Sequence, residues 1–92
     1  MASGDYSHAE GCGTDAEYCS HAEGNYTHAV GTYTHTEGEY TSANGSHSHA
    51  EGFATYSNGN ASHSEGYSTK TNGHYSHAEG NYTEAAGFAE HA

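Results

Sequence analysis

Glycine recurs every seven residues along the whole chain, and this regularity limits the folds that the chain can adopt. Twelve of the thirteen glycines share one register, with a single residue missing between Gly11 and Gly24. A fixed repeat that covers a chain from end to end is typical of solenoids and other repeat architectures. The glycines in register are Gly4, Gly11, Gly24, Gly31, Gly38, Gly45, Gly52, Gly59, Gly66, Gly73, Gly80 and Gly87.

The composition excludes an ordinary globular core. The 92 residues include no Leu, Ile, Trp or Pro, and Val30 is the only aliphatic residue larger than Ala apart from Met1. A chain this short is marginally stable even with a normal core. Hydrophobicity alone would indicate disorder, but disorder does not require residue types to recur at a fixed phase. We therefore expect a stack of short strands around small side chains.

The heptad alternates between small and larger residues with the period of a β-strand. When glycine is counted as position one, positions four and six are small, and positions five and seven are larger and polar. This alternation predicts that the small side chains lie on one face of each strand. We expect glycine to form the turn to the next strand, because positive φ costs it little. Position four comprises Ser7, Thr14, Ser20, Thr27, Thr34, Thr41, Ser48, Thr55, Ser62, Thr69, Ser76 and Thr83, and position six comprises Ala9, Ala16, Ala22, Ala29, Thr36, Ala43, Ala50, Ser57, Ser64, Thr71, Ala78, Ala85 and Ala92.

Alternate heptads differ, which predicts a fourteen-residue coil made of two strands. Odd heptads carry His at position five and Glu at position seven, whereas even heptads are mixed at both positions. We expect one all-β domain over residues 1–92, with an irregular coil at 12–20 and roughly six coils in a rod on the order of 30 Å long. The conserved pattern within the chain, named the His/Glu ladder below, is His8, Glu10, His21, Glu23, His35, Glu37, His49, Glu51, His63, Glu65, His77, Glu79 and His91.

A recurring pentapeptide carries a resemblance to known families. Ser-His-Ala-Glu-Gly occurs at 7–11, 20–24, 48–52 and 76–80. The repeat resembles the head repeats of trimeric autotransporter adhesins, and it is similar to repeats of phage tail-fibre-like proteins. The resemblance implies a left-handed parallel β-roll in a homotrimer, with small residues inside each roll. It also implies that the His/Glu ladder faces the threefold axis, where the adhesins carry Val and Ile.

The ladder allows three interpretations. In a trimer, each layer would bring three His and three Glu together, and protonated His beside Glu would form charge-assisted hydrogen bonds. The net charge of −11 would become −1 if all ten His were protonated (−11 + 10). On this interpretation the pKa of the His rises and stability peaks at mildly acidic pH. A solvated His stripe and a set of metal ligands are the alternatives.

The alternative function is transition-metal binding at the ladder, by a His-rich module built on the same roll. The fold requires no cofactor, but neutral imidazoles bind Zn, Cu, Ni or Fe. His47 and His49 are alternate residues, so a single strand would place both on one face, and three chains would bring six imidazoles together. The other interpretation of His47 is packing, since it occupies a position that Tyr33 and Tyr75 hold elsewhere.

The remaining residues indicate which binding partners and which location to expect. Cys12 and Cys19 flank the irregular coil and are candidates for a disulfide, which suits an extracellular protein. Tyr and Phe gather beside the glycines, where they either pack the corners or bind a glycan or cell-surface receptor. Lys70 is the only basic residue besides His, which argues against nucleic-acid binding. We expect no membrane insertion, and no Ser–His pair stands out from the repeat as an enzyme site.

These observations predict a structural or adhesive rod. We expect a trimeric β-roll segment of an extracellular fibre, filament or adhesin, located outside the cell, at its surface or on a phage virion. Strands with open edges recruit further chains, so we also expect the trimers to stack head to tail.

Overall fold

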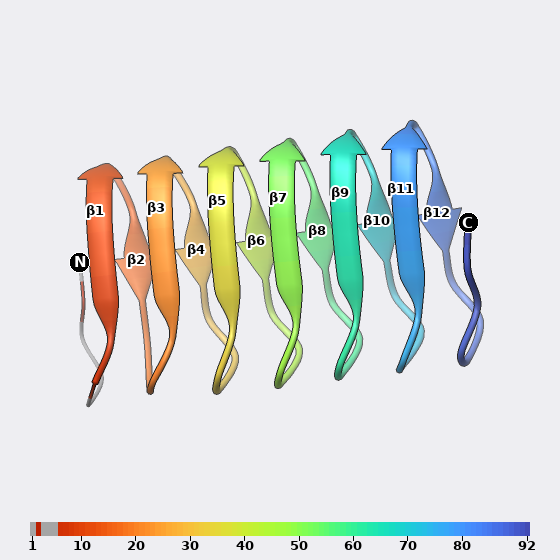
Figure 1. The fold of residues 1–92 in the computed structure, drawn as a ribbon, viewed down its shortest axis with the longest axis horizontal. Helices are drawn as coiled ribbons and strands as arrows, with labels where there is room; N and C mark the ends of the chain where they lie inside the picture. The colour runs from red at the N-terminus through yellow and green to blue at the C-terminus, as the bar shows by residue number, and fades with distance from the viewer. Residues whose placement is uncertain (1, 3–5) are drawn as a thin grey trace.

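The chain folds into a parallel β-solenoid in which each fourteen-residue coil contributes one long and one short strand (Figure 1). The computed structural model describes Ala2 and residues 6–92. The long strands are β1 (His8–Cys12), β3 (His21–Asn25), β5 (His35–Glu39), β7 (His49–Phe53), β9 (His63–Tyr67) and β11 (His77–Asn81). The short strands are β2 (Asp15–Ala16), β4 (His28–Ala29), β6 (Ser42–Ala43), β8 (Tyr56–Ser57), β10 (Lys70–Thr71) and β12 (Glu84–Ala85).

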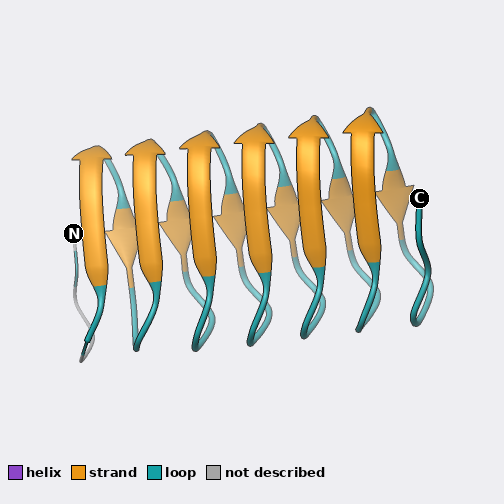
Figure 2. Cartoon of the chain, in the orientation of Figure 1, coloured by secondary structure: helices purple, strands orange, loops and turns teal. Residues whose placement is uncertain are grey.

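The strands form two six-stranded parallel sheets that lie back to back (Figure 2). The long strands pair in the order β1-β3-β5-β7-β9-β11, and the short strands pair in the same sequence order. Each residue faces its counterpart one coil away; His49, for example, lies opposite both His35 and His63. The Cα extents are 31 × 20 × 10 Å, which confirms a rod of the expected length.

The small residues of the repeat fill the interior, as the alternation predicts. Ala50 and Ala78 on the long strands, and Ala43 and Ala85 on the short strands, have no exposed surface. Between them lie Ser and Thr at positions four and six, which are also buried except at Ser7 and Thr83 near the ends of the stack. The two sheets can approach this closely only because no interior side chain exceeds Thr in size.

Hydroxyls at position four hold the corners before the long strands. Ser48 Oγ donates to the carbonyl oxygen of Gly45 at 2.6 Å, and Ser62 Oγ donates to that of Gly59 at 2.6 Å. These bonds satisfy carbonyl oxygens at the corner, which lie outside the backbone hydrogen-bond pattern of the sheets. The position-four hydroxyl of the odd heptads therefore has a structural role in the turn, whereas the buried Oγ1 atoms of Thr27, Thr41 and Thr69 in the even heptads have no hydrogen-bond partner among the described residues.

The expectation that glycine forms the turns is wrong for half of the repeats. Glycines of the odd heptads, such as Gly59, have no positive φ. In these heptads the residue at position three adopts the left-handed conformation instead, as at Tyr33 (φ 59), Ala61 (φ 55) and Tyr75 (φ 59). Glycine is needed there because the coils are so close: a Cβ on Gly59 would lie 2.1 Å from the carbonyl oxygen of Gly73.

The irregular coil at 12–20 keeps its place in the stack. His8 and His21 are only thirteen residues apart, yet they pair directly across β1 and β3. The missing residue falls in the turn between β2 and β3, where Tyr18 (φ 26) and Cys19 (φ 55) both have positive φ. The shortened turn therefore leaves both sheets in register.

Candidate functional site

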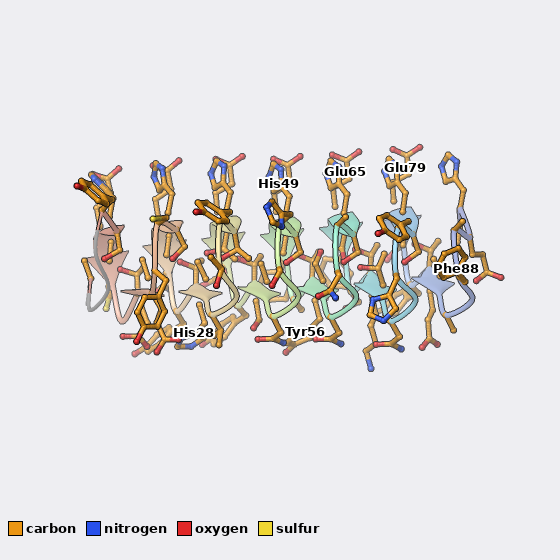
Figure 3. All side chains as sticks on the ribbon, turned by 90° about the horizontal axis from the view of Figure 1, so that it is seen from below. His28, His49, Tyr56, Glu65, Glu79 and Phe88 are labelled. Carbon is orange, nitrogen blue, oxygen red and sulfur yellow. The ribbon has the colours of Figure 1, made fainter. Side chains whose placement is uncertain are left out.

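The His/Glu ladder covers the outer face of the long-strand sheet. His49 and Glu51 flank Ala50 on β7, and since side chains alternate along a strand, both point outward when Ala50 points inward. In Figure 3, His49, Glu65 and Glu79 project from one side of the roll, and His28 and Tyr56 project from the opposite side. The repeat has thus placed all members of the ladder on one face.

The imidazole rings of the ladder form a continuous stack. The ring centroids of His49 and His63 are 4.6 Å apart with an interplanar angle of 2°, and those of His63 and His77 are 4.7 Å apart at 2°. The stack extends at 4.7–4.8 Å to His8 at one end and to His91 at the other. Parallel pairing without a register shift imposes this spacing, because equivalent residues repeat once per coil.

Each central imidazole lies between carboxylates of two coils. His63 Nε2 is 3.6 Å from Glu65 Oε2 in its own coil and 3.9 Å from Glu51 Oε1 in the preceding coil. Both distances exceed hydrogen-bond length. The Nε2 atoms of His35, His49, His63 and His77 are buried and have no hydrogen-bond partner.

The carboxylates also form a row, in which neighbouring groups share protons. Hydrogen bonds with Glu37 and with Glu65 raise the pKa of Glu51 to about 8. The same hydrogen bonds lower the pKa of Glu37 and of Glu65, because their ionised forms accept them. Glu51 thus retains its proton at neutral pH, between two carboxylates whose pKa values are lowered.

Two central imidazoles of the ladder, His49 and His63, are stabilised as neutral rings in the single chain. Burial lowers the pKa of His49, and the adjacent rings of His63 and His35 lower it further. The pKa of His63 is lowered by burial and by His77. In the single chain, desolvation and like-charged neighbours outweigh the attraction of Glu at these two positions, and the rise in His pKa expected for the trimer stays a prediction.

We expect stability to be greatest near neutral pH rather than in mild acid. A His with a lowered pKa stabilises the fold above its unfolded value of 6.5, and this stability is lost as the pH falls through the folded value. The raised pKa of Glu51 acts in the other direction, so stability is lost as the pH rises through about 8. Thermal unfolding followed by circular dichroism from pH 5 to 9 measures the loss of stability on both the acidic and the basic side of the maximum. A maximum at pH 5 would contradict the neutral stack.

A groove runs beside the ladder along the length of the rod. It encloses about 1180 Å³ and is lined by the Glu of the ladder and the adjacent glycines, from Glu10 and Gly11 to Glu79 and Gly80. The glycines create it because they carry no side chain next to the Glu row. The sequence repeat contains this signal in the Glu-Gly dipeptide, but the groove itself was not predicted.

The opposite face varies from coil to coil. An amide ladder that the sequence analysis did not identify joins Asn44, Asn58 and Asn72: Asn44 Nδ2 donates to Asn58 Oδ1 at 2.6 Å, and Asn58 Nδ2 donates to Asn72 Oδ1 at 2.9 Å. Asn at position seven of three successive even heptads was its signal. Tyr26, Tyr40 and Tyr56 line a smaller pocket of about 230 Å³ on this side, together with His28, Thr41 and Ser42.

The other candidate residues lie apart from one another. His47 stacks on Tyr33, with centroids 5.1 Å apart, whereas His49 belongs to the ladder stack. Cys12 is the last residue of β1 and Cys19 lies in the turn before β3, so β2 separates the two cysteines in the chain. Both are free thiols in this structure.

The fold and its repeated face define the class of protein: a His-rich, tandem-repeat β-solenoid of the parallel β-roll type. No family model matches the chain, and no curated protein sequence matches it. Within the described part of the chain, no helix has the length and apolar character needed to span a membrane.

Proposed function

We propose that the protein is a structural or adhesive rod, a segment of an extracellular fibre, filament or adhesin in which three chains associate through the ladder face. One observation carries this proposal: the ladder repeats His and Glu without substitution on every long strand, whereas the short-strand face varies. A solvated face tolerates varied polar residues. A face that meets identical copies at every level is more constrained, and symmetric association of identical chains is the commonest form of oligomer.

The unpartnered nitrogens of the ladder support association through this face. Among the described residues, none donates or accepts a hydrogen bond at the buried Nε2 atoms of His35, His49, His63 and His77. A buried polar atom without a partner is destabilising by about 1–3 kcal/mol. Groups from neighbouring chains around a threefold axis would supply partners at each level.

The winding of the coil agrees with the left-handed roll that the resemblance implies. In Figure 1 the long strands ascend on the near side and the short strands return on the far side, while the chain advances from β1 to β12. This path supports a left-handed coil. The resemblance to trimeric adhesin heads and phage fibres thus remains our basis for placing the protein outside the cell, at its surface or on a virion.

Two features would serve a fibre. The parallel pairing of β12 with β10 has the geometry by which a further coil, including one from a second trimer, would extend the short-strand sheet. The pocket formed by Tyr26, Tyr40 and Tyr56 offers aromatic faces beside the His28 ring, a combination suited to a glycan on a cell-surface receptor.

The association can be tested with matched substitutions on the two faces. We expect light scattering to give the mass of a trimer for the parent chain and for Glu84→Arg on the exposed short-strand face. Glu65→Arg would remove the three carboxylates that face the imidazoles of one layer and place three larger guanidinium cations beside those imidazoles, and it is expected to dissociate the trimer. A monomeric parent, or equal masses for the two variants, would refute association through the ladder.

A further inference from the structure

We propose that the His/Glu ladder binds divalent first-row transition-metal ions, such as Zn²⁺ or Ni²⁺, between neighbouring coils, and that one chain holds three of them. Each ion would take two imidazoles and one carboxylate from a His–Glu–His group. The ligands of a group all belong to one chain. Metal binding is therefore independent of the proposed trimer.

The ligand atoms of each group already lie close together. In the group of His49, Glu51 and His63, the donor atoms are all within 4.8 Å of one another. His49 Nε2 is 3.6 Å from Glu51 Oε2, and His63 Nε2 is 3.9 Å from Glu51 Oε1. Zinc bonds of about 2.0–2.1 Å separate tetrahedral ligands by about 3.3 Å. The group can close around an ion if the two stacked rings tilt toward each other.

The buried imidazole nitrogens provide the second, independent observation. The Nε2 atoms of His35, His49, His63 and His77 are buried next to carboxylate oxygens but are too far from them for a hydrogen bond. A metal ion between nitrogen and oxygen would occupy the free lone pair of each neutral ring. Imidazole with carboxylate favours Zn, Cu, Ni or Fe, whereas Mg and Ca prefer oxygen alone.

The stoichiometry follows from the sharing of imidazoles. Neighbouring groups have one His in common; His63 belongs both to the group with Glu51 and to the group with Glu65. A ring nitrogen has one lone pair and binds one ion. The seven His of the ladder therefore form at most three separate neighbouring pairs, with one ring left over.

This sharing predicts that equivalent substitutions have unequal effects. His35→Asn leaves one pair before the gap and two pairs after it, so three ions still bind. His49→Asn leaves three His on each side, and only two ions bind. Both residues are in the middle of the same stack, with similar side-chain exposure of 39% and 34%. A purely structural role of His would not distinguish them.

The experiment is a titration of the purified chain with Zn²⁺ at neutral pH by isothermal calorimetry, with metal content measured after dialysis. We expect three ions for the parent and for His35→Asn, and two for His49→Asn. Replacing His28, His47 and His74 together by Asn tests the residues outside the ladder and should leave three. Equal stoichiometry for His35→Asn and His49→Asn, or equally tight binding of Mg²⁺, would overturn the proposal.

A second pair of variants provides the same comparison if His35→Asn or His49→Asn does not fold. At the C-terminal end, His91→Asn leaves three separate pairs, whereas His77→Asn leaves two. Circular dichroism verifies the fold of each variant before titration. Light scattering on the same samples separates the two proposals: three ions on a monomer would refute the trimer alone, and a trimer without zinc would refute the metal sites alone.

Discussion

Gly52→Ala is expected to unfold the roll, because the added methyl group has no space. Its Cβ would lie 2.1 Å from the carbonyl oxygen of Gly66 in the next coil, and both atoms belong to paired strands that cannot separate locally. Gly52 also has a φ of +109, which is strained for any other residue. Single domains are stable by about 5–15 kcal/mol, and loss of pairing between β7 and β9 would divide the stack. Thermal and urea unfolding followed by circular dichroism measure the effect.

Gly80→Ala is the matched control for this prediction. Gly80 has nearly the same φ, +108, but the nearest atom to an added Cβ is Thr83 Cγ2 at an ordinary 3.7 Å. In this variant, backbone strain alone should lower the free energy of unfolding, by about 1–3 kcal/mol. The chain should remain folded. Equal losses for the two variants would mean that backbone strain, and not the approach of the coils, makes glycine necessary.

Ala50→Leu is expected to have the second largest effect. Ala50 has no exposed surface, and it pairs with Thr36 and Ser64 in the adjacent long strands. The roll is only 10 Å across in its shortest Cα extent, so a Leu side chain has no room between the sheets. Overpacking costs about 1–3 kcal/mol in larger cores, and this thin core should reach or exceed the upper value. The free energy of unfolding in urea gives the measurement.

An exposed alanine provides the comparison for Ala50. Ala86 occupies position seven of an even heptad, where Val30 shows that an apolar side chain is accommodated on the surface. Ala86→Leu should change the free energy of unfolding by less than about 0.5 kcal/mol. If Ala50→Leu were as stable as Ala86→Leu, the small residues of position six would not form the interior.

Both proposals, the trimer and the metal sites, start from the same buried nitrogen atoms of the ladder. The stacked imidazoles of His35, His49, His63 and His77 have buried nitrogens for which the described residues supply no hydrogen-bond partner. Other chains would satisfy them by hydrogen bonds, and metal ions would satisfy them by coordination. The pH profile, the oligomeric mass and the zinc stoichiometry are separate measurements of how the ladder is completed.

The sequence by itself determined the coil and its interior. Period two places Ala50 inside and His49 outside, and the difference between odd and even heptads sets fourteen residues per coil; both are local properties of consecutive residues. For the same reason, the order of the strands and the alignment of the His and Glu rows on one face could be predicted from the repeat alone.

Only the tertiary structure decided what depends on distances between coils. The carbonyl oxygen of Gly66 lies where a side chain of Gly52 would be, and Ala61 rather than Gly59 has a positive φ at the corner before β9. The lowered pKa of His49 likewise arises from its burial and from rings fourteen residues away in both directions. Steric contact and electrostatic coupling act through space between coils, and a one-dimensional pattern does not contain those distances.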